Sequence, residues 1–137
     1  MSTELFCDTS YLVAILNPYD DLHERAEALS REYHNASLCT TSAVLIETLN
    51  YFARYQLQVR SAAAELVALI EQHEQFAIIH LSCDLLLASI EFYRERKDKS
   101  YSGTACVSML VMQERGIRAA LTKDKHFKQE NFEILLV

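Results

Sequence analysis

The stretch that decides the fold is Leu5-Phe6-Cys7-Asp8-Thr9-Ser10, near the start of the chain. Three apolar residues in a row are typical of a short buried strand, and the polar residues behind them are typical of a helix cap. The pattern therefore predicts a strand over 5–7, followed by a helix that runs to about Leu16 and ends before Asn17-Pro18.

The rest of the chain repeats this unit. We expect strands over 37–40, 76–81, 117–121 and 132–136, with the strand over 76–81 covered on both faces. Helices are expected over 20–32, 43–54, 61–72, 83–96, 103–115 and 126–129, with Gly116 ending the helix over 103–115. This alternation predicts a three-layer α/β/α fold with a central parallel sheet of four to five strands. Function is then expected at the carboxyl ends of the strands.

The composition fits one domain over residues 1–137. Apolar residues make up 50% of the chain, enough for a real core, and two glycines and one proline leave little material for linkers. The formal charge of −6 argues against a broad basic face that grips nucleic acid. It does not argue against a nuclease whose acids gather in one cleft.

The sequence contains no stretch that is typical of a membrane span or a signal peptide. The longest apolar stretch, Ala105–Met112, is too short to cross a bilayer, and the N-terminus lacks the basic region and long apolar run of a signal peptide. We therefore expect a soluble, cytoplasmic protein. Four cysteines lie far apart among apolar neighbours, which predicts buried free thiols: Cys7, Cys39, Cys83 and Cys106.

Three acids stand out. Asp8 and Asp124 directly follow apolar strands, so in a parallel sheet both emerge at the same edge. Glu47 lies in the apolar helix over 43–54, where an unpaired carboxylate is costly to bury and needs a cation, a donor or water. Taken singly, Asp8 and Asp124 also fit as helix caps, and Glu47 fits as a partner of Arg54 or Arg60. Their joint placement favours a functional site.

The motifs around these acids resemble those of a known family, the PIN domain of VapC-like toxins. The matching stretches are Cys7–Ala14, Thr41–Glu47, Lys99–Ser102 with Cys106–Met109, Glu114–Ile117 and Ala120–Phe127. One position departs from the pattern, because the family has a Thr-Asp-Cys run where this chain has Thr104-Ala105-Cys106. Ala105 is either a deliberate inactivating substitution or natural decay of the site, and the intact neighbours favour the first.

The resemblance implies a metal-dependent endoribonuclease, the toxin of a toxin–antitoxin pair, using Mg²⁺ or Mn²⁺. Asp8 is the implied central ligand, Asp124 and an acid at position 105 complete the set, and Glu47 binds directly or through water. Thr9 and Thr122 are the implied supporting residues. The implied partners are an RNA substrate, a small antitoxin whose C-terminal segment covers the acidic groove, and a second copy in a homodimer. With Ala105 in place, weak or absent cleavage is expected.

Basic and aromatic residues near the acids have two interpretations each. Two runs either steer phosphates or are ordinary surface charge: Arg94, Arg96, Lys97 and Lys99, and Lys123, Lys125 and Lys128. His126 is expected to be structural. Leu45, Leu49 and Phe52 share one helix face, and Tyr51, Phe52 and Tyr55 are interpreted as core or dimer contacts rather than base-stacking platforms.

Other functions fit less well. A haloacid dehalogenase-type phosphatase needs a second aspartate where this chain has Ser10, and a response-regulator receiver needs an aspartate after the third strand, where it has His80-Leu81-Ser82. The serious alternative is a catalytically dead PIN domain that binds RNA or a protein partner without cutting.

Overall fold

The computed structural model describes residues 3–137. Its five strands are β1 (Glu4–Cys7), β2 (Ser37–Thr41), β3 (Phe76–Ile79), β4 (Ala119–Leu121) and β5 (Glu133–Ile134). Its seven helices are α1 (Thr9–Leu16), α2 (His23–Glu32), α3 (Ser42–Tyr51), α4 (Leu57–Gln72), α5 (Cys83–Glu95), α6 (Gly103–Arg115) and α7 (His126–Gln129). None of the helices described over 3–137 is long and apolar enough to cross a membrane.

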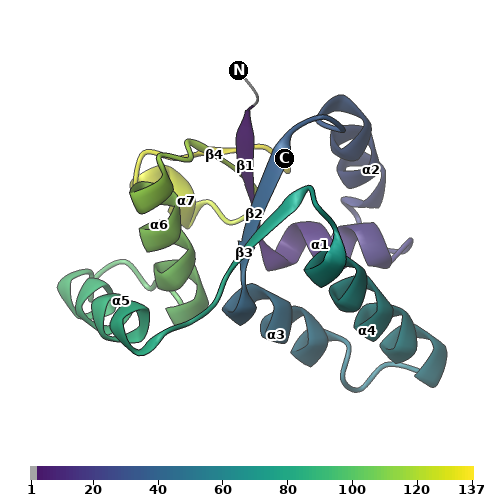
Figure 1. Cartoon of the computed structure of the whole chain (residues 1–137), viewed down its shortest axis with the longest axis horizontal. Helices are drawn as coiled ribbons and strands as arrows, with labels where there is room; N and C mark the ends of the chain where they lie inside the picture. Colours follow the sequence, from purple (N-terminus) through teal and green to yellow (C-terminus); the bar gives the residue numbers. More distant parts are fainter. Residues whose placement is uncertain (1–2) are drawn as a thin grey trace.

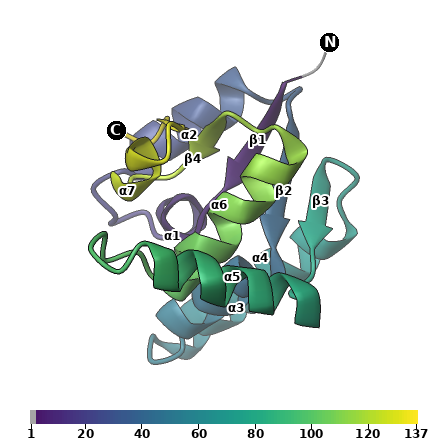
Figure 2. The same cartoon turned by 90° about the vertical axis from the view of Figure 1, so that its left-hand side faces the viewer.

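The strands form one sheet in the order β3-β2-β1-β4-β5, and every pair in it is parallel. Figure 1 shows α1, α2 and α4 on one side of the sheet and α5, α6 and α7 on the other. In the view turned by 90°, α6 lies across β1 and β2, and α5 packs beside α6 (Figure 2). The three-layer α/β/α architecture expected from the sequence is confirmed.

The opening strand of the sequence is the central strand of the sheet. β1 pairs with β2 on one side and with β4 on the other, and Leu5, Phe6 and Cys7 are 1%, 0% and 0% exposed. A strand that is buried on both faces reads as a continuous apolar run, which explains why this stretch was decisive.

Helix caps follow the expected chemistry at several ends. The side chains of Thr41, Ser82 and Ser102 each accept a backbone N–H bond in the first turn of the helix that follows. Gly116 ends α6 in the left-handed conformation, with φ of 69°. Such a conformation favours glycine, so the predicted stop at Gly116 is confirmed.

Four expectations need correction. β3 is an edge strand that pairs only with β2, and its four residues are half-buried rather than covered on both faces. α4 begins at Leu57, four residues before the expected start, and α2 begins only at His23 because Asp20 forms a turn with Leu22. All four cysteines are free as expected, but Cys83 is exposed, since it opens α5 at the surface.

Candidate active site

The candidate site lies where β1 and β4 end side by side. Cys7 pairs with Leu121 in the parallel ladder, so the residues after them, Asp8 and Thr122, leave the sheet together. The Thr122 hydroxyl donates a hydrogen bond of 2.6 Å to Asp8 Oδ2, and the Asp8 N–H donates to the Leu121 carbonyl at 3.2 Å. Parallel pairing thus brings together two positions that are 114 residues apart in the sequence.

Asp8 does not act as a helix cap. It occupies the N-cap position of α1, but its side chain makes no capping hydrogen bond. Burial raises its pKa from 3.8 to about 6, the hydrogen bonds from Thr122 and the Thr9 backbone oppose the rise, and the charges of Glu47 and Asp124 add to it. Asp8 is 8% exposed, and its carboxyl group is bound by Thr122 instead of capping the start of α1.

Glu47 reaches toward Asp8 from α3. The Thr9 hydroxyl at the start of α1 donates a short hydrogen bond to Glu47 Oε1. Within residues 3–137 Glu47 forms no ion pair, and Arg60 instead donates to the Ala53 carbonyl at 2.8 Å. Pairing of Glu47 with Arg54 or Arg60 is therefore not what this structure contains.

Asp124 is fixed by the loop between β4 and α7. Its Oδ1 accepts a hydrogen bond of 2.9 Å from the His126 N–H and lies 3.2 Å from His126 Nδ1. Its own N–H donates to the Thr122 hydroxyl at 3.1 Å. Asp124 therefore does contact the first turn of α7, as the capping interpretation expects, and it shares Thr122 with Asp8.

Tyr101, Arg96 and Glu130 form a network of hydrogen bonds that contacts this loop through His126 and that the sequence did not reveal. The Tyr101 ring lies 5.3 Å from the His126 ring, and the Tyr101 hydroxyl donates to Glu130 Oε2 at 2.8 Å. Arg96 donates to the same oxygen at 2.9 Å. Burial and the Glu130 carboxylate raise the pKa of Tyr101 to about 12.

Arg96 is consequently engaged in the fold. It pairs with Glu130, and its guanidinium lies 3.7 Å from the centre of the Phe92 ring. Neither phosphate steering nor ordinary surface charge, the two interpretations of this run, therefore describes Arg96. Arg94 pairs with Glu91 in the same helix.

The three acids face one cavity of about 530 Å³. Its lining comprises these acids, hydroxyl groups, two lysines and one tyrosine among others: Asp8, Thr9, Ser10, Val13, Asp20, Glu47, Tyr51, Lys123, Asp124 and Lys125.

Ala105 is not part of this lining. It is 4% exposed among core residues, in the first turn of α6, where its N–H donates to the Ser102 hydroxyl at 3.0 Å. The link of Ala105 to the site therefore rests on the Thr104-Ala105-Cys106 motif, in which the family has an aspartate at this position.

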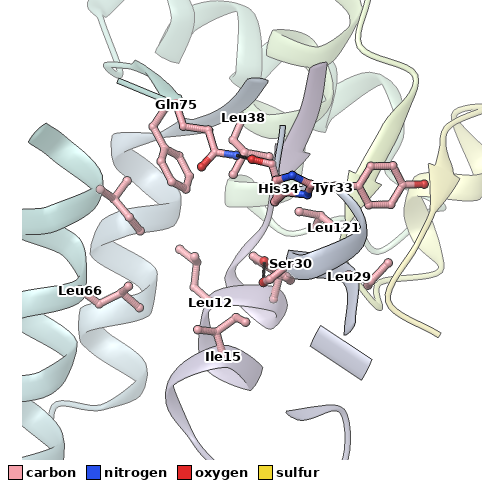
Figure 3. Close-up of a pocket in the computed structure, with 13 residues that line it drawn as sticks. Leu12, Ile15, Leu29, Ser30, Tyr33, His34, Leu38, Leu66, Gln75 and Leu121 are labelled. Carbon is pink, nitrogen blue, oxygen red and sulfur yellow. Dashed lines mark hydrogen bonds between the residues drawn. The ribbon is translucent and has the colours of Figure 1, made fainter. Parts of the chain in front are cut away.

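A second cavity, of about 250 Å³, has different chemistry. It lies between α1, α2, α4 and the sheet and is lined mainly by apolar side chains such as Leu12, Leu29 and Leu66 (Figure 3). Tyr33, His34 and Gln75 supply polar groups there, but no carboxylate lines it. Of these two cavities, the acidic one has the oxygen donors that a hard cation requires.

The residues of the acidic cavity fit a hydrated divalent ion in donor chemistry. Mg²⁺ prefers oxygen ligands, keeps several waters and needs only one or two carboxylates from the protein. Among residues 3–137, no three His, Cys, Asp or Glu side chains lie close enough together to hold one ion jointly. The set therefore suits an ion that depends on water for much of its coordination.

Comparison with known proteins assigns the family. The PIN domain family model matches residues 5–132, so the chain belongs to the PIN domain family. The resemblance seen in the sequence motifs is thereby confirmed. No curated protein sequence matches the chain.

Solved structures agree with this assignment. The chain is similar to VapC20 from Mycobacterium tuberculosis, described as a sarcin-ricin loop cleaving toxin, with 26% identity and a TM-score of 0.83 over 93% of this chain and 95% of that one. It is also similar to FitAcB from Neisseria gonorrhoeae (14% identity, TM-score 0.68, 96% of both chains). VapBC2 from Rickettsia felis, bound to a promoter DNA fragment, is similar at 15% identity and a TM-score of 0.66, over 96% and 97% of the two chains. The last two likenesses show the fold alone.

Proposed function

We propose that this chain is a metal-dependent endoribonuclease of the toxin type, with a site that lacks one acid at Ala105. The observation that carries the proposal is the state of Asp8: buried, bound by Thr122 instead of capping α1, and facing one cavity with Glu47 and Asp124. The similarity to a toxin that cleaves the sarcin-ricin loop supports RNA as the substrate.

Asp8, Glu47 and Asp124 are the residues that would hold hydrated Mg²⁺ or Mn²⁺, one or two of them directly and the rest through its waters. When bound, such an ion supplies a water of lowered pKa and neutralises charge at the phosphate. Thr122 and Thr9 keep the carboxylates of Asp8 and Glu47 oriented, because each donates a hydroxyl hydrogen bond to one of them. These hydrogen bonds hold the two acids in place before any ligand binds.

The lysines of the cavity would bind the RNA backbone. Lys123 and Lys125 are exposed and line the same hollow as the acids. They follow β4 on either side of Asp124, so a phosphate group that binds these lysines lies beside the acids. A net charge of −6 is compatible with this arrangement, because the attraction is local.

Partners follow from the same assignment. Similar structures include toxin–antitoxin complexes such as VapBC from Salmonella typhimurium bound to DNA, which supports a small antitoxin as a partner of this chain. We also propose a homodimer. The loss of an acid at Ala105 favours a second candidate function, in which this PIN domain binds RNA or a protein without cutting.

Restoring the missing acid tests the proposal. Ala105→Asp should raise Mg²⁺-dependent cleavage of RNA at least tenfold above the starting chain, in line with the usual effect of residues around a metal site. Asp8→Asn on top of Ala105→Asp should remove the gain, and a chelator should do the same. If Ala105→Asp cleaves no faster than the starting chain while remaining folded, the binding-module function is the better account.

A further inference from the structure

One aromatic side chain shares the acidic cavity. Tyr51 is the last residue of α3, four positions after Glu47, and this spacing puts the two side chains on one face of the helix. Tyr51 lines the cavity together with Glu47 and is 47% exposed. A large aromatic ring is therefore open to a ligand that reaches the acids.

The Tyr51 ring is held by an aromatic cluster. Phe52 beneath it is fully buried, at 0% exposure, and the two ring centres lie 4.9 Å apart in an edge-to-face arrangement. Phe52 makes a second edge contact with Tyr55 at 4.9 Å, and Tyr51 lies 5.8 Å from Tyr55. A buried anchor of this kind limits the motion of Tyr51, so little ordering is needed when a flat ligand stacks on it.

The remaining walls of the cavity determine which flat ligand fits. Lys123 and Lys125 suit a phosphate, and the acids suit a metal ion, so the cavity combines groups for phosphate with one exposed ring. A nucleotide of RNA carries a phosphate and a flat base on the same unit. Bases stack on aromatic side chains only when they are unpaired and splayed out, since the edges and faces of duplex RNA are not accessible in this way.

We propose that Tyr51 is a base-stacking residue of the RNA site. The inference rests on the proposed ribonuclease function and adds to it a residue that binds a base of the RNA. An exposed tyrosine also fits a contact with a second copy of the chain. The position of Tyr51 on the wall that carries Glu47 favours the base.

The absence of tryptophan from the sequence gives a clean probe. Tyr51→Trp places a single tryptophan on the cavity wall, and Tyr93→Trp, at a site 56% exposed on α5, is the matched control. The ligands are a single-stranded RNA dodecamer and an abasic strand of the same length, which keeps the phosphates but lacks the bases. RNA should quench the tryptophan of Tyr51→Trp strongly, the abasic strand should not, and the control should respond to neither.

Affinity gives a second measurement on the chain as it exists, whose cleavage is expected to be weak. Tyr51→Ala should bind the labelled RNA dodecamer about tenfold more weakly, because one base stack has an effect of this order. Tyr51→Phe should keep the affinity, Tyr93→Ala should match the starting chain, and all variants should bind the abasic strand equally.

The outcomes separate the two proposals. RNA binding without quenching in Tyr51→Trp, or an unchanged affinity in Tyr51→Ala, overturns base stacking and leaves the ribonuclease function in place. A change in oligomeric state of Tyr51→Ala with unchanged RNA affinity assigns Tyr51 to an interface between copies and also overturns stacking. If neither the starting chain nor any variant binds RNA, the proposed function fails, and stacking fails with it.

Discussion

Replacing Asp8 with asparagine should make the protein more stable at neutral pH. The reason is the raised pKa of this carboxyl group, which burial moves from 3.8 to about 6. A shift of that size corresponds to about 3 kcal/mol of stability that is lost when the buried group ionises. Asp8→Asn removes the charge and keeps an oxygen that accepts the Thr122 hydrogen bond.

The sign of the pH dependence follows from the direction of the shift. Because the folded chain holds the Asp8 proton more tightly than the unfolded chain, the contribution is fully present below about pH 3.8 and is lost as the pH rises through about 6. Asp8→Asn has no such loss. The difference in unfolding free energy between the variant and the starting chain should therefore grow in favour of the variant between pH 4 and pH 7, by up to about 3 kcal/mol.

Urea unfolding in a metal-free buffer with chelator, at several pH values from 4 to 7.5, measures this difference. Asp98→Asn is the matched control, because Asp98 is exposed in the connection between α5 and α6 and its replacement should change little at any pH. A difference between Asp8→Asn and the starting chain that stays constant with pH, or that moves against the variant as the pH rises, would refute the assignment of Asp8 as a buried acid of raised pKa.

Three further changes have expected outcomes. Glu130→Gln removes the charge that two donors share and should lower the unfolding free energy by about 2 kcal/mol in urea titrations; a change below about 0.5 kcal/mol would show that the network is not structural. Gly116→Ala should cost about 1 kcal/mol, because φ is 69° and no neighbouring atom crowds an added methyl group; a neutral result would contradict a purely conformational role for this glycine. Replacing both Lys123 and Lys125 with alanine should flatten the dependence of RNA affinity on salt concentration, and an unchanged slope would exclude phosphate contacts at these lysines.

Much of the fold was predictable because its signals are local. The apolar run before Asp8 and the stop at Gly116 each determine structure within a few residues. The burial of β3 was not predictable in the same way, because it depends on the place of that strand at the edge of the sheet. Sequence alone shows an apolar strand, and topology decides how many neighbours cover it.

The acids of the candidate site were found for a similar reason. Strand ends of a parallel sheet meet at one edge, so Asp8 and Asp124 were expected together, and the structure brings Glu47 to the same cavity. The support of Asp124 by Tyr101 and Glu130 was missed, because it joins residues far apart in sequence through contacts that no spacing reveals.

Tyr51 and Phe52 show that aromatic character alone does not tell where a side chain at the end of α3 lies. Helical spacing correctly predicted that Phe52 faces the core, where it is fully buried. Tyr51 was interpreted with it as a core or dimer contact. One residue along a helix turns a side chain by about 100°, and Tyr51 is exposed on the cavity wall, so it is not a core contact, while a dimer contact stays a prediction. Residue type alone did not distinguish the two rings.

The affinity for Mn²⁺ tests the central claim most directly, because it reports on the acid site itself without requiring turnover. Titration calorimetry on the starting chain, on Ala105→Asp and on Ala105→Asp with Asp8→Asn would compare the site with three, four and again three of the four acids in place. The account predicts that Ala105→Asp binds Mn²⁺ at least tenfold more tightly than the starting chain, and that adding Asp8→Asn removes that binding. Equal affinity in all three proteins would contradict it.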